Sequence, residues 1–225
     1  GKKPYYFDKE WEERERAEHW LGHRRRGPQY DQSHVPVREQ TEAVGHSVRA
    51  TYMYAGMVDV AMETGDEELL KACRRLWENI VYKRMYVTGS IGSESYSEAF
   101  TFDYDLPNDT IYGETCAAIA LVFFAQRMLN AEPKGRYGDI MERALYNGVI
   151  SGMSLDSGVS MDGRYFFYVN PLEVNPEACE KNAVMSHVKP IRQKWFGCAC
   201  CPPNLARLLA SLGYYIYGVR DNIIY

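Results

Sequence analysis

The chain has 225 residues, a formal net charge of −4 and a pI near 5.8. This acidic balance argues against a nucleic-acid or anionic-membrane surface, and no apolar stretch reaches the roughly 18–20 residues of a membrane helix. We therefore expect a globular protein with no nucleic-acid and no membrane partner. No signal peptide opens the chain, so the expected location is cytoplasmic.

The predicted elements are mostly helices separated by polar loops. Residues 6–22 could hold a first helix, and residues 27–38 read as a loop because Gly27-Pro28 and Pro36 interrupt any regular pattern. A helix is predicted to begin near residues 36–41 and to run to 63, because apolar residues recur at three- and four-residue steps. Asp66 is the expected N-cap of the next helix, over residues 66–84.

The interval 85–112 is predicted to be a long functional loop, since it is rich in Gly, Pro and polar residues. Apolar helices are predicted at residues 114–130 and 137–150, and another at 205–217. Residues 163–169 look like a strand, and residues 218–225 like a turn followed by the start of a strand. The sum is an all-α pattern with a small β excursion.

Two cysteine-containing stretches carry the chemistry of the sequence. Six cysteines in a chain of this length do not make a disulfide-dense scaffold, and three of them, Cys198, Cys200 and Cys201, lie within four residues. A carboxylate and another thiol, Glu114 and Cys116, stand at the start of an apolar helix. Such clustering fits metal binding or catalysis, although the spacing alone leaves buried free thiols as an equal alternative.

Several motifs resemble the β-L-arabinofuranosidases of glycoside hydrolase family 127, and they occur in the family's order. They are PVREQTEAVGH at residues 36–46, SEAF at 97–100, GETCA at 113–117, FYVNPL at 167–172 and FGCACCPPN at 196–204. The resemblance implies a retaining glycosidase whose catalytic domain is an (α/α)6 barrel followed by β-sandwich domains. Residues 1–217 would be part of the barrel, and residues 218–225 the start of a truncated β-sandwich domain.

The resemblance also implies roles for particular residues. A Zn²⁺ ion would be held by Glu114, Cys116, Cys200 and Cys201. Cys200 would be the nucleophile, and Glu98 the general acid/base that faces it. His46 and Tyr168 would contact the sugar, while Cys198 would lie outside the metal shell. The implied partner is a carbohydrate, from which β-L-arabinofuranose or a related sugar of a plant-type glycan would be released.

Two other interpretations of the cysteine stretches stay open. One is a structural zinc site in a non-catalytic carbohydrate-binding or interaction module. The other is a zinc hydrolase in which water on the metal attacks, although four protein ligands leave no open position for it.

Since the motifs begin part-way through the family's barrel, we expect the isolated chain to be a nearly inactive fragment, or a homo-oligomer that covers exposed helix faces.

Overall fold

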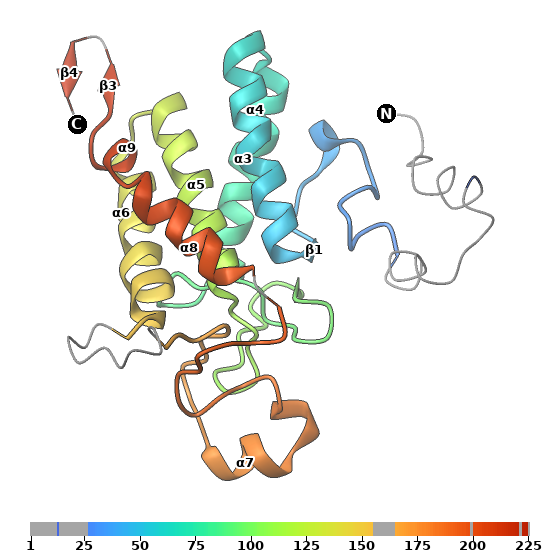
Figure 1. Cartoon of the computed structure of the whole chain (residues 1–225). Coiled ribbons are helices and arrows are strands. Elements are labelled where there is room, and N and C mark those ends of the chain that lie inside the picture. Colours follow the sequence, from blue (N-terminus) through green and yellow to red (C-terminus); the bar gives the residue numbers. More distant parts are fainter. Residues whose placement is uncertain (1–12, 14–26, 155–164, 199, 221, 225) are drawn as a thin grey trace.

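The computed structural model describes residues 27–154, 165–198, 200–220 and 222–224, with Glu13 besides. The helix expected at residues 6–22 lies almost wholly outside these residues. The described part is mostly helical with a few two-residue strands, which confirms the all-α class with a small β excursion (Figure 1). Within it, every helix is too short or too polar to cross a membrane.

The described part contains seven α-helices and two pairs of short strands. The helices are α3 (Ser47–Thr64), α4 (Glu67–Asn79), α5 (Thr115–Ala131), α6 (Gly135–Ala144), α7 (Pro176–Lys181), α8 (Cys201–Ala210) and α9 (Gly213–Ile216). Strands β1 (Gly45–His46) and β2 (Ala99–Phe100) are far apart in the chain and pair antiparallel, whereas β3 (Val219–Arg220) and β4 (Ile223–Ile224) form a hairpin. Short π-helical turns, Ile80–Arg84 and Leu145–Val149, extend α4 and α6.

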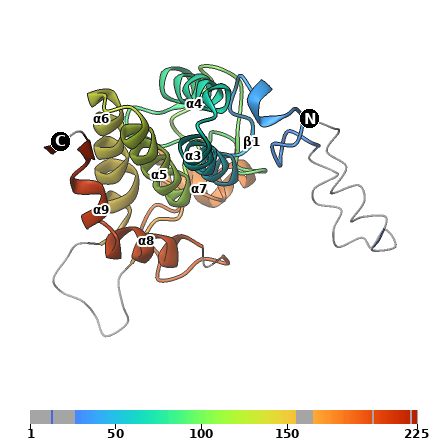
Figure 2. The same cartoon turned by 90° about the horizontal axis from the view of Figure 1, so that it is seen from above.

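Helix α5 is the centre of the hydrophobic core. It packs against α3, α6 and α8, and α4 packs against α3 (Figure 2). Its residues from Thr115 to Ala125 are all buried, because a helix that is apolar on every face is stable only when it is surrounded. The helical pairs α3–α4 and α5–α6 are joined by short turns, which is the antiparallel arrangement that the loop lengths predict.

Helix α3 begins later than the sequence pattern indicates. The helix predicted from residues 36–41 onward is wrong in its first part, where the chain forms the 3₁₀ turn Val37–Glu39 and then the strand β1. The reason is Gly45, whose φ of +75° is a left-handed conformation that a helix cannot continue through. An added Cβ at Gly45 would lie 2.1 Å from the carbonyl oxygen of Gln29.

Other predicted boundaries can be compared in the same way. Asp66 is the N-cap of α4 and accepts from the backbone N–H of Leu69 at 2.9 Å, as predicted. The interval 85–112 contains little regular structure besides β2, as expected for a long loop.

The strand expected at residues 163–169 is wrong for the described part, 165–169, which makes only isolated bridges such as that between Phe166 and Gln193. Helix α8 begins at Cys201 rather than at residue 205, because Pro202 and Pro203 fit the first helical turn.

Apolar side chains are exposed near the C-terminal end of the described chain. Those of Tyr214, Tyr217 and Val219 are each more than 70% exposed. Exposure of this kind is typical of a surface that another element or chain covers. The oligomeric state remains a prediction, as does the assignment of residues 218–225 to a separate β-sandwich domain.

The packing of α5 gives a first test. Phe124 lies 5.9 Å from Tyr54 and 5.4 Å from Trp77 between ring centroids, and it is fully buried. We expect Phe124→Ala to lower the free energy of unfolding by about 3–5 kcal/mol, since it removes contacts and leaves a cavity. Urea unfolding followed by circular dichroism measures this. Met62→Ala, at a side chain that is 51% exposed, is the control and should change the value by no more than about 0.5 kcal/mol.

Candidate active site

Three helices begin at one place in the fold. The N-cap residues are His46 for α3, Glu114 for α5 and Cys200 for α8. Figure 1 shows these ends of the helices facing the layer of loops below the bundle. Unpaired backbone N–H groups give each helix N-terminus a partial positive charge, which stabilises anions and lowers the pKa of nearby thiols. The site is therefore built where thiolates and carboxylates are favoured.

Glu114, Cys116, Cys200 and Cys201 form one compact cluster. The Sγ atom of Cys116 lies 3.4 Å from those of both Cys200 and Cys201, which are 3.8 Å apart. The Oε1 atom of Glu114 is 3.1 Å from Cys200 Sγ and 3.7 Å from Cys201 Sγ. Residues that are more than eighty positions apart are thus brought together by the contact of α5 with α8.

The cluster has the dimensions of a tetrahedral metal site. All four ligand atoms lie within 4.8 Å of one another. Zinc bonds of about 2.3 Å to sulfur and about 2.0–2.2 Å to oxygen imply separations of roughly 3.5–3.8 Å between ligands, close to those found. The Oε2 atom of Glu114 is buried without a hydrogen-bond partner. A buried orphan oxygen beside three thiols is the donor chemistry that suits Zn²⁺.

The pKa values in the cluster follow from burial and from mutual repulsion. Burial, and then the charge of Cys200, raise the pKa of Glu114 to about 9. Burial also raises the pKa of Cys201, whereas hydrogen bonds from Cys200 and Cys201 lower the pKa of Cys116. Adjacent buried anions repel one another, so without a cation these groups share protons. A bound cation would release those protons.

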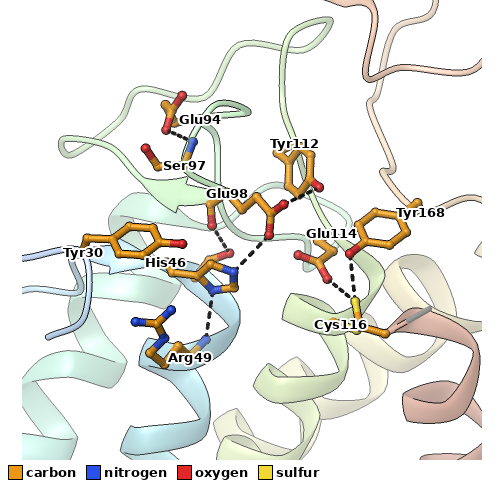
Figure 3. Close-up of polar contacts among 12 residues, drawn as sticks. Tyr30, His46, Arg49, Glu94, Ser97, Glu98, Tyr112, Glu114, Cys116 and Tyr168 are labelled. Carbon is orange, nitrogen blue, oxygen red and sulfur yellow. Dashed lines mark hydrogen bonds and ion pairs between the residues drawn. The ribbon is translucent and has the colours of Figure 1, made fainter. Parts of the chain in front are cut away.

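Glu98 is held from two sides. Its Oε2 lies 3.0 Å from the Nε2 of His46, and the hydroxyl of Tyr112 donates to its Oε1 at 3.0 Å. Figure 3 shows the carboxylate between these two side chains and beside Glu114. Its side chain is 35% exposed, so the group is fixed in direction yet open to solvent. This is the geometry that a general acid/base needs.

The backbone of Glu98 is also unusual. Its φ of +55° is rare for a residue with a side chain. The strained turn is fixed because Ser47 donates to the carbonyl of Glu98 with both its N–H and its hydroxyl, each at 2.9 Å. The carboxylate of Glu94 accepts from the backbone N–H groups of Tyr96 and Ser97, which closes the loop. Strain that the surroundings hold in place is common at functional sites.

His46 takes a defined tautomer. The backbone N–H of Arg49 donates to its Nδ1 at 3.3 Å, so the proton of the neutral ring is on Nε2, which donates to Glu98. His46, Glu98 and Glu114 also lie close enough to form a second group of metal-ligand type. A metal on Nε2 would move the ring proton to Nδ1, where it would oppose the N–H of Arg49. The second group is therefore better explained by hydrogen bonding than by a metal.

One cleft exposes both halves of the site. It has a volume of about 540 Å³ and is lined by His46, Glu98, Glu114, Tyr168, Cys198 and Cys200, together with part of α8. The hydroxyl of Tyr168 lies 2.8 Å from Cys200 Sγ, so this tyrosine contacts the thiol directly. Cys198 is exposed, whereas Cys73 is buried in the core. The volume suits one small ligand.

The structure brings the predicted site residues together: all of them line this cleft except Cys201, which contacts Cys116 and Cys200 behind it. His46, which the pattern places midway along a helix, instead caps the helix, because Gly45 ends the preceding segment. Sequence reasoning missed Tyr112 and gave no role to Asn204. The residues next to them in the sequence do not mark either one as functional, since a tyrosine before a glycine and an asparagine after two prolines also occur in ordinary turns.

Comparisons with known proteins show the family to which the chain belongs. Residues 8–214 match the family profile of the β-L-arabinofuranosidase, GH127 catalytic domain. The chain is 52% identical over 194 residues to the non-reducing end β-L-arabinofuranosidase of Bifidobacterium longum subsp. longum, an alignment that covers 86% of this chain and 28% of that protein.

Solved structures give the same relationship. A GH127 β-L-arabinofuranosidase from Geobacillus stearothermophilus T6 is 57% identical with a TM-score of 0.90, over 100% of this chain and 34% of that one. Another GH127 β-arabinofuranosidase is 48% identical with a TM-score of 0.76, over 88% of this chain and 28% of that one. The chain thus spans about a third of its relatives' length.

These likenesses define the class as that of glycoside hydrolases with a mostly helical catalytic domain. Within that class, the chain belongs to family 127, and residues 8–214 correspond to the family's catalytic domain.

The tautomer of His46 can be measured. We expect nitrogen NMR of the chain labelled in histidine to show an unprotonated Nδ1 and a protonated Nε2 at His46, since the N–H of Arg49 fixes the ring. His46→Asn, which keeps an N-cap side chain, assigns the signal by its loss. A proton on Nδ1 in the parent chain would contradict this hydrogen-bond network.

Proposed function

We propose that this chain carries the nucleophile and the acid/base of a retaining glycosidase that acts on β-L-arabinofuranosides. The observation that carries the proposal is the single cleft that exposes both the Cys200 thiol and the fixed carboxylate of Glu98. Family membership supports the reaction class. The name of the Bifidobacterium relative supports attack at the non-reducing end of a glycan.

In the first step, the sulfur of Cys200 attacks the anomeric carbon of the bound sugar. The carbon–sulfur bond forms as the glycosidic carbon–oxygen bond breaks, and the carboxyl of Glu98 gives its proton to the leaving oxygen. Cys200 is suited to this step because it caps α8, contacts the hydroxyl of Tyr168 and faces the cleft.

In the second step, water hydrolyses the thioglycoside. The carboxylate of Glu98 takes a proton from the water as its oxygen bonds to the anomeric carbon, and the thiolate of Cys200 leaves. The donors His46 and Tyr112 stabilise the ionised carboxylate that accepts this proton. Two inversions at the anomeric carbon give overall retention. His46 and Tyr168 also stand where they could hydrogen-bond the sugar hydroxyls.

A zinc ion held by Glu114, Cys116, Cys200 and Cys201 would keep sulfur in the thiolate form at neutral pH. A free cysteine, whose pKa is about 8.5, is mostly protonated there. Three of the four ligands, Glu114, Cys116 and Cys201, are at least 98% buried, so their role is to hold the cluster. Cys200 lines the cleft and is the one residue of the four that is not buried.

Zinc binding provides a test that does not depend on activity. We expect one zinc per chain, with affinity that rises with pH because binding releases protons from the thiols. Cys116→Ala and Cys201→Ala should each lose stoichiometric zinc, measured by atomic emission after dialysis. Cys198→Ala is the matched control and should retain it. Stoichiometric zinc in both ligand variants would refute this ligand set.

Catalysis is best tested in a protein of the relatives' full length. A chimera in which it replaces the matching third of the Geobacillus relative should hydrolyse p-nitrophenyl β-L-arabinofuranoside. Cys200→Ser should lower kcat at least about 10³-fold, and Glu98→Gln about 10²- to 10⁴-fold. Cys179→Ser and Glu63→Gln are the matched controls and should leave kcat unchanged. A thiol-directed sugar analogue should label Cys200.

The same measurements separate the enzyme from a structural zinc module. The buried positions of Glu114, Cys116 and Cys201 suit a structural site as well, so zinc binding alone does not discriminate. A structural module would bind zinc and yet leave the analogue unreacted in the chimera. Full turnover by the chimera carrying Cys200→Ser would rule out the cysteine as nucleophile.

A further inference from the structure

The strand pair β1–β2 places His46 beside Glu98 (Figure 3). His46 pairs with Ala99, and Glu98 directly precedes Ala99 in the chain. Each strand has two residues, and a strand pair this short is marginally stable by itself. Because side chains alternate between the two faces of a strand, a slip by one residue would turn His46 away from Glu98. The register therefore needs support from outside the pair.

Side chains at the end of α4 hold the segment that leads into β1. The backbone N–H of Ala43 donates to the Oδ1 of Asn79 at 2.8 Å, and the carbonyl of Ala43 accepts from the guanidinium of Arg84. Ala43 is fully buried, and Asn79 and Arg84 are buried as well. The N–H and the carbonyl of Ala43 are thus both fixed by side chains of α4 and its π-helical turn, two residues before β1 begins at Gly45.

Asp103 orients the two side chains that hold Ala43. Its Oδ1 accepts from the Nδ2 of Asn79 at 3.0 Å and from the Nε of Arg84 at 2.8 Å. Its Oδ2 accepts from the Nζ of Lys83 at 2.8 Å. These hydrogen bonds, that of Lys83 first, lower the pKa of Asp103 to about 2, so the carboxylate stays charged at neutral pH. Asp103 also stands three residues after the end of β2.

The π-helical turn Ile80–Arg84 explains how Asn79 and Arg84 reach the same oxygen atom. The two residues are five positions apart, and in an α-helix such positions point to different faces. A π-helical turn is wider, with hydrogen bonds from i to i+5, so both side chains fall on one side. The turn thereby joins α4 to the chain ahead of β1 and to the chain behind β2.

We propose that Asp103 is a positioning residue that, through these side chains of α4 and its π-helical turn, keeps His46 against Glu98. This role rests on the proposed function, in which Glu98 is the acid/base. Asp103 is not one of the described residues that line the cleft, so it acts through the position of the two strands. A misplacement of about 1 Å that originates far from the chemistry can cost about 10²-fold in rate.

A double-mutant cycle in the chimera with the Geobacillus relative tests this role. We expect Asp103→Ala to lower kcat about 10- to 100-fold, because Glu98 is then held less precisely. In a chimera that already carries Glu98→Gln, the same change should lower kcat by no more than about 3-fold, since the group that it positions is gone. Asp59→Ala removes another aspartate that pairs with an arginine, Arg127, and is the matched control that should leave kcat unchanged.

A conservative variant separates the hydrogen bonds from the volume of the side chain. Asp103→Asn keeps one oxygen for Asn79 and Arg84 and loses the hydrogen bond from Lys83. We expect it to keep kcat within about 5-fold of the parent, the equivalent of one hydrogen bond. A loss as large as that of Asp103→Ala would contradict the assignment of Oδ1 as the atom that orients the two side chains.

Amide hydrogen exchange in the 225-residue chain follows the strand pair without any activity. The N–H of Ser47 donates to the carbonyl of Glu98 at 2.9 Å, so its exchange reports whether β1 stays against β2. We expect Asp103→Ala to speed this exchange at least about 10-fold. Exchange at Leu121, which is fully buried in α5, is the internal control and should stay unchanged.

The outcomes are distinct. A folded Asp103→Ala protein would overturn the proposed role if kcat fell by the same factor with and without Glu98→Gln, or if exchange at Ser47 stayed parental. If that variant does not fold, Asn79→Ala takes its place in both measurements with the same expectations. Parental kcat in Glu98→Gln alone would overturn the acid/base of the proposed function, and exchange at Ser47 would still decide whether Asp103 fixes the strand pair.

Discussion

The convergence of three helix N-termini is the constraint on which the rest of the site depends. His46, Glu114 and Cys200 each cap a different helix, and the packing of α5 between α3 and α8 brings the three caps together. Helix ends of like partial charge repel one another, so their meeting is stable only around anions. Thiol and carboxyl side chains, whose ionised forms carry negative charge, lie at these helix starts.

The number of ionisable groups at the site limits how many of them can be charged at the same time. Three thiols and two carboxylates would exceed the charge of one divalent cation if all were ionised, so their protonation must be controlled. His46 faces Glu98 with its Nε2, because its Nδ1 accepts from the backbone N–H of Arg49 at the start of α3. Arg207 donates to the amide oxygen of Asn204 and stays outside the cluster.

The two halves of the site, the thiol cluster and Glu98, are held in place in different ways. The ligand cluster is attached to helices and is almost wholly buried, so its geometry follows from core packing. Glu98 lies in a loop with a strained backbone, and it needs Ser47, Glu94, His46 and Tyr112 to hold it. Because the side chain of Glu98 is partly exposed, local hydrogen bonds replace the packing that burial gives to the cluster.

The sequence by itself determined the elements and the chemistry of the site. Apolar periodicity predicted α4, α5 and α6, Asp66 marked a helix start, and the clustered cysteines with Glu114 indicated a metal or catalytic centre. Only the tertiary structure decided which groups meet. The left-handed turn at Gly45 moved His46 from a helix interior to a cap, and Tyr112 and Asn204 acquired partners from helices and loops distant in the chain. Periodicity and motifs record local preferences, whereas a hydrogen bond between Tyr52 and Asn204 spans 152 positions and exists only because α3 and α8 pack beside α5.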